Sequence, residues 1–141
     1  MLARMLLVAV AAVVVVALLM SRHDAQACET ARHDVLRVTG KLLPASAGPA
    51  AIQAVRDHCR GSDGLVAVAG VLHSVGRDRE ALRIAREAAR KEPANATAWV
   101  GVAITADAVG DDVTARRAAR RALALSPRDP PPVRLGGASG P

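Results

Sequence analysis

Two cysteines are the residues of this chain whose chemistry is most narrowly defined. Cys28 and Cys59 are its only thiols, and each lies in a stretch whose apolar residues recur at helical spacing. The first stretch continues with Ala31, Val35, Val38 and Leu42, and the second contains Ile52 and Val55. Between them lies LLPASAGP, whose proline and glycine content predicts a turn. The sequence therefore predicts a helical hairpin over residues 25–61, with the two cysteines near enough for a disulfide.

Two other interpretations of the thiols compete with the disulfide. In one, both cysteines are free and buried; in the other, they bind a metal together with His33 and His58. The metal interpretation is the weaker one, because Cys28 and His33 lie on different faces of a helix and the spacing matches no known zinc pattern. We therefore expect no metal and favour a disulfide, which persists in oxidising compartments. Buried free thiols remain the alternative.

Residue types that act in catalysis are present but scattered. His73 precedes Ser74, and GSDG occupies residues 61–64, yet no spacing brings a nucleophile, a base and an orienting group together. The sequence contains no glycine-rich phosphate loop. Asn95 begins a glycosylation pattern, but a helix is expected to begin there, and capping of that helix explains the asparagine more simply. The sequence therefore predicts a protein that is not an enzyme and needs no cofactor.

The elements that hold these residues are helices arranged in a repeat. The stretch SDGLVAVAGVLHSVGRDREALRIAREAARKEP, ending at Pro93, aligns without gaps with ATAWVGVAITADAVGDDVTARRAARRALALSP, which ends 34 positions later at Pro127. The coinciding residues are Leu65 with Trp99, Val68 with Val102, Ala69 with Ala103, Gly76 with Gly110, Ala81 with Ala115, Ala85 with Ala119 and Ala88 with Ala122. A fixed period of this size indicates stacked helix pairs.

These two repeats resemble the tetratricopeptide repeat family. The positions that carry the resemblance are Leu65, Ala69, Ala81, Ala88 and Pro93 in the first repeat and Trp99, Ala103, Ala115, Ala122 and Pro127 in the second. The repeats are slimmer than the family pattern, because the aromatic residue of its second helix is Ala85 and Ala119 here. Its first-helix tyrosine is Leu72 and Ala106. The resemblance covers residues 62–128 and implies antiparallel helix pairs that stack into an α-solenoid.

Glycines and aspartates mark the turn inside each repeat. Gly76 and Gly110 are expected to end the first helix in the left-handed conformation that glycine accepts readily. Asp78 is expected to cap the second helix of the first repeat, and Asp111 or Asp112 that of the second. Two alanine-rich repeats bury little apolar surface, so residues 25–61 are expected to form a third, degenerate unit that caps the amino side of the stack.

The amino-terminal segment has the composition of a membrane span. The apolar run from Leu2 to Met20 is long enough to cross a bilayer as a helix, and it is interrupted only by Arg4. An uncleaved signal anchor is favoured. The alternatives are a secretory peptide cleaved after Ala27 and lipidation of Cys28. Charges on the two sides of the run are nearly balanced, and we favour a cytoplasmic amino terminus with the body outside.

The expected fold class is all-α, an amino-terminal transmembrane helix followed by an α-solenoid of stacked antiparallel helix pairs. A carboxy-terminal stretch rich in proline and glycine cannot build a core and is expected to be disordered. The expected divisions are a transmembrane signal anchor at 1–24, a helical hairpin cap at 25–61, repeats at 62–95 and 96–128, and the tail at 129–141.

A groove along the first helices is one candidate binding surface. The resemblance implies that it is lined by Val66, Gly70, His73, Val100, Ile104 and Asp107. A narrow apolar groove of this kind suits an extended or helical peptide of a protein partner. The alternative is that Val66, Val100 and Ile104 pack against the hairpin instead.

Arginines on the second helices form the other candidate surface. Four of them occupy two equivalent repeat positions, Arg83, Arg86, Arg117 and Arg120. With a formal net charge of +6, such a face suits an anionic lipid or cell-wall polymer. The simpler interpretation is a solvated face supported by Glu80–Arg83 and Glu87–Lys91 ion pairs. Nucleic acid is not expected as a partner, because Trp99 is the only aromatic residue and no nucleic-acid-binding motif is present.

The sequence thus predicts a single-pass protein of the cell membrane that acts as a non-catalytic scaffold for protein–protein interaction at the cell envelope. Electrostatic binding of an anionic lipid or cell-wall polymer through the arginine face is the alternative.

Overall fold

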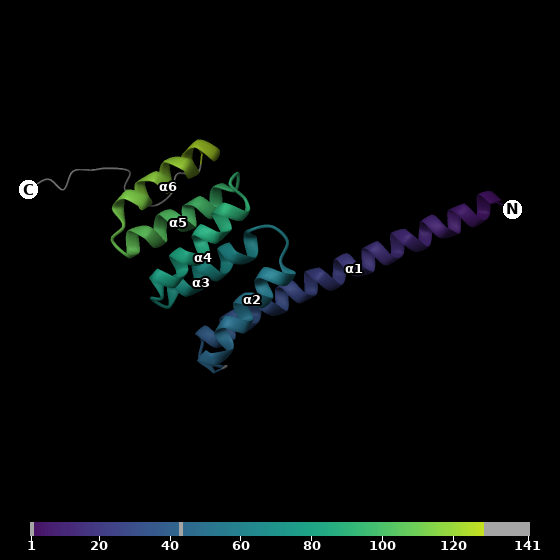
Figure 1. Ribbon diagram of the computed structural model, residues 1–141, viewed down its shortest axis with the longest axis horizontal. Helices are drawn as coiled ribbons and strands as arrows, with labels where there is room; N and C mark the ends of the chain where they lie inside the picture. Colours follow the sequence, from purple (N-terminus) through teal and green to yellow (C-terminus); the bar gives the residue numbers. More distant parts are fainter. Residues whose placement is uncertain (1, 43, 129–141) are drawn as a thin grey trace, which may run out of the picture.

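Helices make up all the regular structure that the computed structural model describes, which covers residues 2–42 and 44–128. Figure 1 shows their arrangement. The elements are α1 (Leu2–Thr39), a 3-10 turn (Ala45–Ala47), α2 (Gly48–His58), α3 (Asp63–Ser74), α4 (Asp78–Lys91), α5 (Ala96–Ala108) and α6 (Asp112–Leu125). The predicted all-α class is confirmed. The tail predicted to be disordered, residues 129–141, lies outside the described residues.

The first helix, α1, runs unbroken for 38 residues. Its length is about 57 Å at the usual rise per residue, and its amino-terminal half projects away from the other helices (Figure 1). The boundary expected at residue 24, between anchor and cap, therefore falls inside a helix. The reason is local: the segment SRHDAQA after Met20 contains no glycine or proline that would end a helix.

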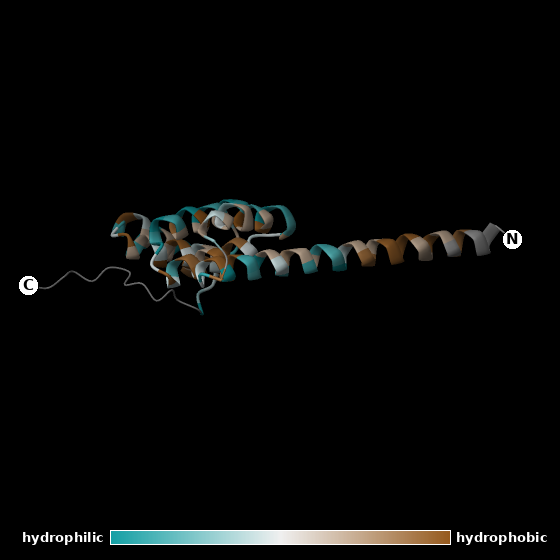
Figure 2. Ribbon diagram, turned by 90° about the horizontal axis from the view of Figure 1, so that it is seen from below, coloured by the Kyte–Doolittle hydropathy of each residue, from teal (hydrophilic) through white to brown (hydrophobic). Residues whose placement is uncertain are grey.

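From Leu6 to Met20, the described side chains on every side of the projecting half of α1 are apolar. Large apolar side chains that remain at least half exposed there are Leu6, Leu7, Val10, Val13, Val14, Val15, Val16, Leu18, Leu19 and Met20. Figure 2 shows this half mostly in brown and pale colours, extending away from the other helices, in which hydrophobic and hydrophilic segments alternate. Among the described helices, α1 is long and apolar enough to cross a membrane. A helix that is apolar all round is typical of a membrane span.

The carboxy-terminal part of α1 pairs with α2 and forms the amino-terminal unit of the stack. Three of its residues are buried, and each lies 34 positions before a buried residue of α3: Ala31, Val35 and Val38 before Leu65, Ala69 and Leu72. The period of the two repeats therefore continues into the hairpin. This spacing supports the expectation that the hairpin is a third, degenerate unit.

The three helix pairs are stacked so that their first helices adjoin one another. α3 contacts both α1 and α5, while α4 packs against α3 and α5. The core is rich in small residues, and those with no exposed surface include Ala81, Ala88, Ala98, Ala103, Ala106, Ala119 and Ala122. Small side chains let the helices approach closely: a Cβ added to Gly101 would lie 3.7 Å from Cβ of Ala85. The bulkiest buried side chains include Leu65, Leu72 and Ile84.

The turns inside the repeats follow the glycines, but only one of the two predicted aspartate caps forms. Gly76 and Gly110 have φ of 76° and 77°, as predicted. Asp111 caps α6 by accepting a hydrogen bond from the Thr114 backbone N–H. The predicted cap by Asp78 is wrong. Asp78 lies inside α4, and its Oδ1 contacts Nδ1 of His73 at 2.5 Å, so the imidazole in the last turn of α3 competes for this carboxylate.

Asn95 begins α5 as predicted. Its Oδ1 accepts hydrogen bonds from the backbone N–H groups of Thr97 and Ala98. Its Nδ2 donates to Oγ of Ser62 at 2.9 Å and to Oδ1 of Asp63 at 3.1 Å, across the boundary between the two repeats. The asparagine therefore serves both as a helix cap and as a link between the beginnings of α3 and α5.

Candidate functional site

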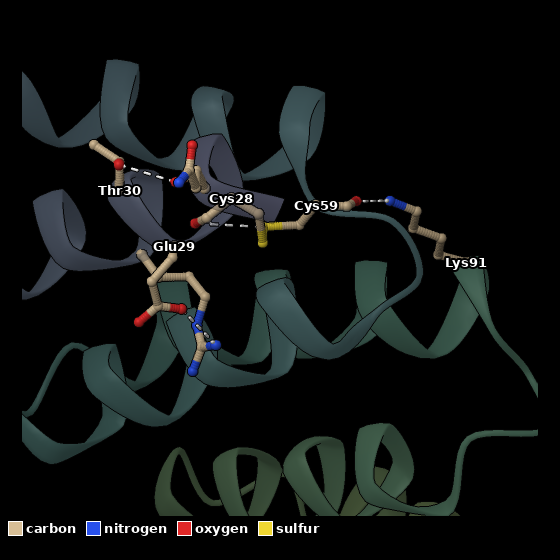
Figure 3. Close-up of a disulfide and its surroundings, with 7 residues drawn as sticks. Cys28, Glu29, Thr30, Cys59 and Lys91 are labelled. Atoms are coloured by element: carbon tan, nitrogen blue, oxygen red, sulfur yellow. Dashed lines mark hydrogen bonds and ion pairs between the residues drawn. A yellow bond between two sulfur atoms is a disulfide. The ribbon is translucent and has the colours of Figure 1, made fainter. Parts of the chain in front are cut away.

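A disulfide joins Cys28 and Cys59, as the sequence predicts. The sulfur atoms are 2.05 Å apart and the Cα atoms 4.8 Å apart (Figure 3). The bond connects the carboxy-terminal half of α1 to the residue that follows α2, and Cys59 is buried. Packing around it is tight, because a Cβ added to Gly64 would lie 2.7 Å from Cβ of Cys59. Within the described residues, no group of three or more potential ligands could hold a metal ion.

The disulfide occupies the place where the next unit is closed by hydrogen bonds. Cys28 and Cys59 lie 34 positions before Ser62 and Pro93. In the first repeat the fully buried Ser62 donates from Oγ to Oε2 of Glu92 at 2.6 Å, which joins the start of α3 to the end of α4. This hydrogen bond lowers the pKa of Glu92. A disulfide thus joins the two helices of the cap at the place where a side-chain hydrogen bond joins those of the first repeat.

An ion pair ties the second helix of the cap to the second helix of the first repeat. Nε of Arg56 donates to Oε1 of Glu87 at 2.7 Å, and Nη2 of Arg56 donates to Oε2 at 2.9 Å. Hydrogen bonding to Arg56 lowers the pKa of Glu87. The Glu87–Lys91 pair expected from the sequence is wrong: Nζ of Lys91 donates instead to the carbonyl oxygen of Cys59 at 3.1 Å. These partners come from another unit, which a pattern within one helix does not reveal.

The six residues predicted for the groove lie at matching positions on α3 and α5, which adjoin each other. Their exposure varies. Val66, Val100 and Ile104 are half-buried, and Gly70 and Asp107 are exposed. A Cβ added to Gly70 would meet no atom within 4 Å, so the surface is open there. His73 is half-buried, and Nδ1 of its imidazole contacts Oδ1 of Asp78.

The same face continues onto α1, which the sequence did not indicate. Leu36 lies 34 positions before Gly70, and it is 48% exposed. A shallow hollow of about 50 Å³ lies between α1 and α3, lined by Arg32, Val35, Leu36, Ala67, Val68 and Val71. One repeat position, represented by Leu36, Gly70 and Ile104, therefore lies at least partly at the surface on α1, α3 and α5, and α3 contacts both of the other helices. We call the surface around this position the α1/α3/α5 face.

The four arginines predicted for an anionic surface are not equivalent. Nη2 of Arg86 donates to Oδ2 of Asp111 at 3.0 Å and to Oγ1 of Thr114 at 3.3 Å, which links α4 to the start of α6. Nη2 of Arg83 lies 3.7 Å from Oε1 of Glu80. Arg117 and Arg120 are exposed on α6 and form no ion pair within the part of the chain that the structure describes. The free positive charge of this surface therefore lies mainly on α6.

Comparison with known proteins identified no relative of this chain. The chain matches no family model, no curated protein and no solved structure. The resemblance to the tetratricopeptide repeat family rests on the residues of the two repeats. The stacked helix pairs agree with it.

Proposed function

We propose that the protein is a membrane-anchored, tetratricopeptide-like scaffold that binds a peptide segment of a protein partner at the cell envelope and catalyses no reaction. The observation that carries this proposal is the α1/α3/α5 face. Its position Leu36–Gly70–Ile104 is apolar, lies at least partly at the surface, and recurs on three adjoining helices. An extended or helical peptide that lies across these helices would bury apolar surface along a stretch of its own length.

Two features near the amino terminus support the cell-envelope location. α1 carries the apolar half that suits a membrane span, and the disulfide lies directly after it, at Cys28. Disulfides persist outside the reducing cytoplasm. We therefore propose that the body of the protein lies on the outer side of the membrane, with the amino terminus in the cytoplasm.

A second candidate function is electrostatic binding of an anionic lipid or cell-wall polymer. It is favoured by the exposure of Arg117 and Arg120, which have no acidic partner in the described structure. Binding by these side chains weakens steeply with salt, because exposed charges are screened. Binding on the apolar α1/α3/α5 face changes little with salt.

Site-specific photo-crosslinking in the membrane tests the first function. A photoreactive amino acid is placed at Gly70 or Leu36 on the α1/α3/α5 face, and at Arg117 on α6 as a control. We expect the two face positions to give the same crosslinked product and the Arg117 position to give none of it. A product formed from Arg117 alone, and lost at high salt, contradicts the scaffold function and supports the electrostatic one.

A further inference from the structure

The span and the stack share one helix, so the direction of the span fixes which side of the stack faces the membrane. Because the helices of each pair are antiparallel, the starts of α3 and α5 and the ends of α2, α4 and α6 lie toward the amino-terminal half of α1 (Figure 1). We call this side the proximal edge. It consists of residues 59–62, 91–95 and 126–128.

The proximal edge lies close to the end of the apolar span. Nη2 of Arg60 donates to Oδ2 of Asp24 at 2.7 Å, and Asp24 is only four residues beyond Met20, about 6 Å along the helix. Cys28, bonded to Cys59 of the edge, is about 12 Å beyond Met20. Lipid headgroups occupy about 5 to 7 Å on each side of the hydrocarbon core. Long basic side chains on the edge can therefore reach the headgroup layer.

Basic side chains are spaced along this edge and the adjoining turn of α1. Arg60 is 80% exposed, although it also contacts Asp24. Lys91 is exposed, and its Nζ donates a hydrogen bond to the carbonyl oxygen of Cys59. Arg22 and Arg128 are exposed as well. The four cations come from α1 and from the ends of all three units.

The carboxylates on the same edge already have partners within the protein. Asp24 accepts from Arg60, Asp63 accepts from Nδ2 of Asn95, and Glu92 accepts from Oγ of Ser62. Glu92 is held ionised by that hydrogen bond, which lowers its pKa. Each of these carboxylates thus accepts a hydrogen bond from another side chain of the protein, while Asp24 and Asp63 remain at the surface.

We propose that the proximal edge and the adjoining turn of α1 bind the anionic headgroups of the leaflet from which α1 emerges, through Arg22, Arg60, Lys91 and Arg128. This proposal rests on the membrane anchor of the proposed function, and its surface is separate from the arginine face of α4 and α6. Such binding would fix the orientation of the stack relative to the membrane. The stack lies along the membrane, and the α1/α3/α5 face is held beside the bilayer, where a partner at the membrane surface can reach it.

Trp99 provides a native probe of the edge. It is the only tryptophan of the chain, and its Nε1 donates to the carbonyl oxygen of Pro93 at 2.9 Å, which places the indole beside the turn between α4 and α5. The full chain is reconstituted in phosphatidylcholine vesicles that contain a lipid with a nitroxide on its headgroup, with or without phosphatidylglycerol. We expect stronger quenching of Trp99 in the vesicles with phosphatidylglycerol, and loss of that difference at high salt.

Two matched double variants locate the contact. Lys91→Gln with Arg128→Gln removes two of the four cations, and Arg117→Gln with Arg120→Gln removes the same charge from α6. Each edge charge lost is expected to lower the ratio of docked to undocked protein about fivefold, whereas the α6 variant behaves as wild type. Circular dichroism confirms that both remain folded.

The outcomes separate the edge contact from the anchor. The chain can float with both kinds of vesicle while the quenching of Trp99 is the same with and without phosphatidylglycerol. That result overturns the edge contact and leaves the anchor standing. The edge contact is also overturned if the α6 variant loses quenching as much as the edge variant. Failure to float with either kind of vesicle overturns the membrane anchor, and the edge contact with it.

Discussion

The guanidinium of Arg56 and the carboxylate of Glu87 meet in two parallel hydrogen bonds that join α2 to α4. The cap and the first repeat are thus held together on the side of their second helices, while α1 and α3 adjoin each other on the side of the first helices. Bidentate pairing of this kind is stronger and more directional than a single ion pair. It makes the cap an integral unit of the stack rather than a separate hairpin.

The first prediction concerns the acid sensitivity of this pair. Because hydrogen bonding to Arg56 lowers the pKa of Glu87 in the folded state, the pair stabilises the fold above the ordinary glutamate pKa of about 4.3. That stability is lost as the pH falls from this value through the lower, folded-state pKa. Glu87→Gln is expected to lower the free energy of unfolding at neutral pH by about 1 to 2 kcal/mol, with a smaller acid dependence than wild type.

Urea unfolding at a series of pH values measures both effects. Glu29→Gln is the matched control, because Glu29 pairs with Arg32 on the exposed surface of α1. Its loss is expected to change stability by less than about 1 kcal/mol. If both variants change the free energy of unfolding and its pH dependence equally, the Arg56–Glu87 pair has no stabilising role of its own.

The second prediction concerns the disulfide. Its closed loop has a sequence separation of 31, so the chain-entropy model gives a stabilisation of about 3 to 4 kcal/mol. Cys28→Ser with Cys59→Ser is expected to lower the free energy of unfolding by that amount, a large share for an alanine-rich core. The thiols of the unreduced, denatured protein should also resist alkylation. Rapid labelling of both thiols in material isolated from membranes contradicts the disulfide.

The third prediction contrasts two glycines of α3. An alanine at Gly64 would place its Cβ 2.7 Å from Cβ and 2.8 Å from Sγ of Cys59, so Gly64→Ala is expected to destabilise the fold by about 1 to 3 kcal/mol. An alanine at Gly70 would meet open space, so Gly70→Ala is expected to stabilise α3 by about 0.5 to 1 kcal/mol. Melting temperatures of both variants check this contrast. Destabilisation by Gly70→Ala would mean that the α1/α3/α5 face is packed, not open.

The fourth prediction concerns the anchor. Since α1 continues without a break from its apolar half into the stack, cleavage after Ala27 would divide a helix whose later residues Ala31 and Val35 are core. The full-length chain is therefore expected to remain in the membrane pellet after alkaline carbonate extraction. A soluble form that begins near Cys28 would instead establish cleavage.

Local signals in the sequence predicted the features that depend on few residues. Gly76 and Gly110 have the predicted left-handed backbone because no other residue type accepts it so readily. Asn95 and Asp111 cap their helices because a side-chain oxygen lies beside free N–H groups at each helix start. The disulfide followed from helical spacing on two segments around one turn.

Contacts between units were not predicted, because they depend on how helices stack. Arg56 and Glu87 are separated by a whole unit, and no spacing within either helix pairs them. The mistaken cap at Asp78 arises within one repeat, since His73 of α3 reaches the carboxylate only after the chain turns at Gly76. The extension of the face to Leu36 was hidden because the cap shares the burial pattern of the repeats but few of their residues.

The last prediction tests the α1/α3/α5 face, on which the proposed function depends. Ile104 is half-buried, whereas its neighbour Ala103 has no exposed surface. An arginine at Ile104 can extend its guanidinium to water, so Ile104→Arg is expected to keep the melting temperature of wild type. Ala103→Arg, the matched control, would bury an unpaired charge and is expected to unfold the stack.

The most direct measurement is therefore the yield of the product crosslinked from Gly70, compared between wild type and Ile104→Arg at equal folded concentration. The scaffold function predicts that the product is lost in Ile104→Arg while the melting transition stays unchanged. An undiminished product from a fully folded Ile104→Arg protein, or a large fall in its melting temperature, contradicts the assignment of this face as the binding site.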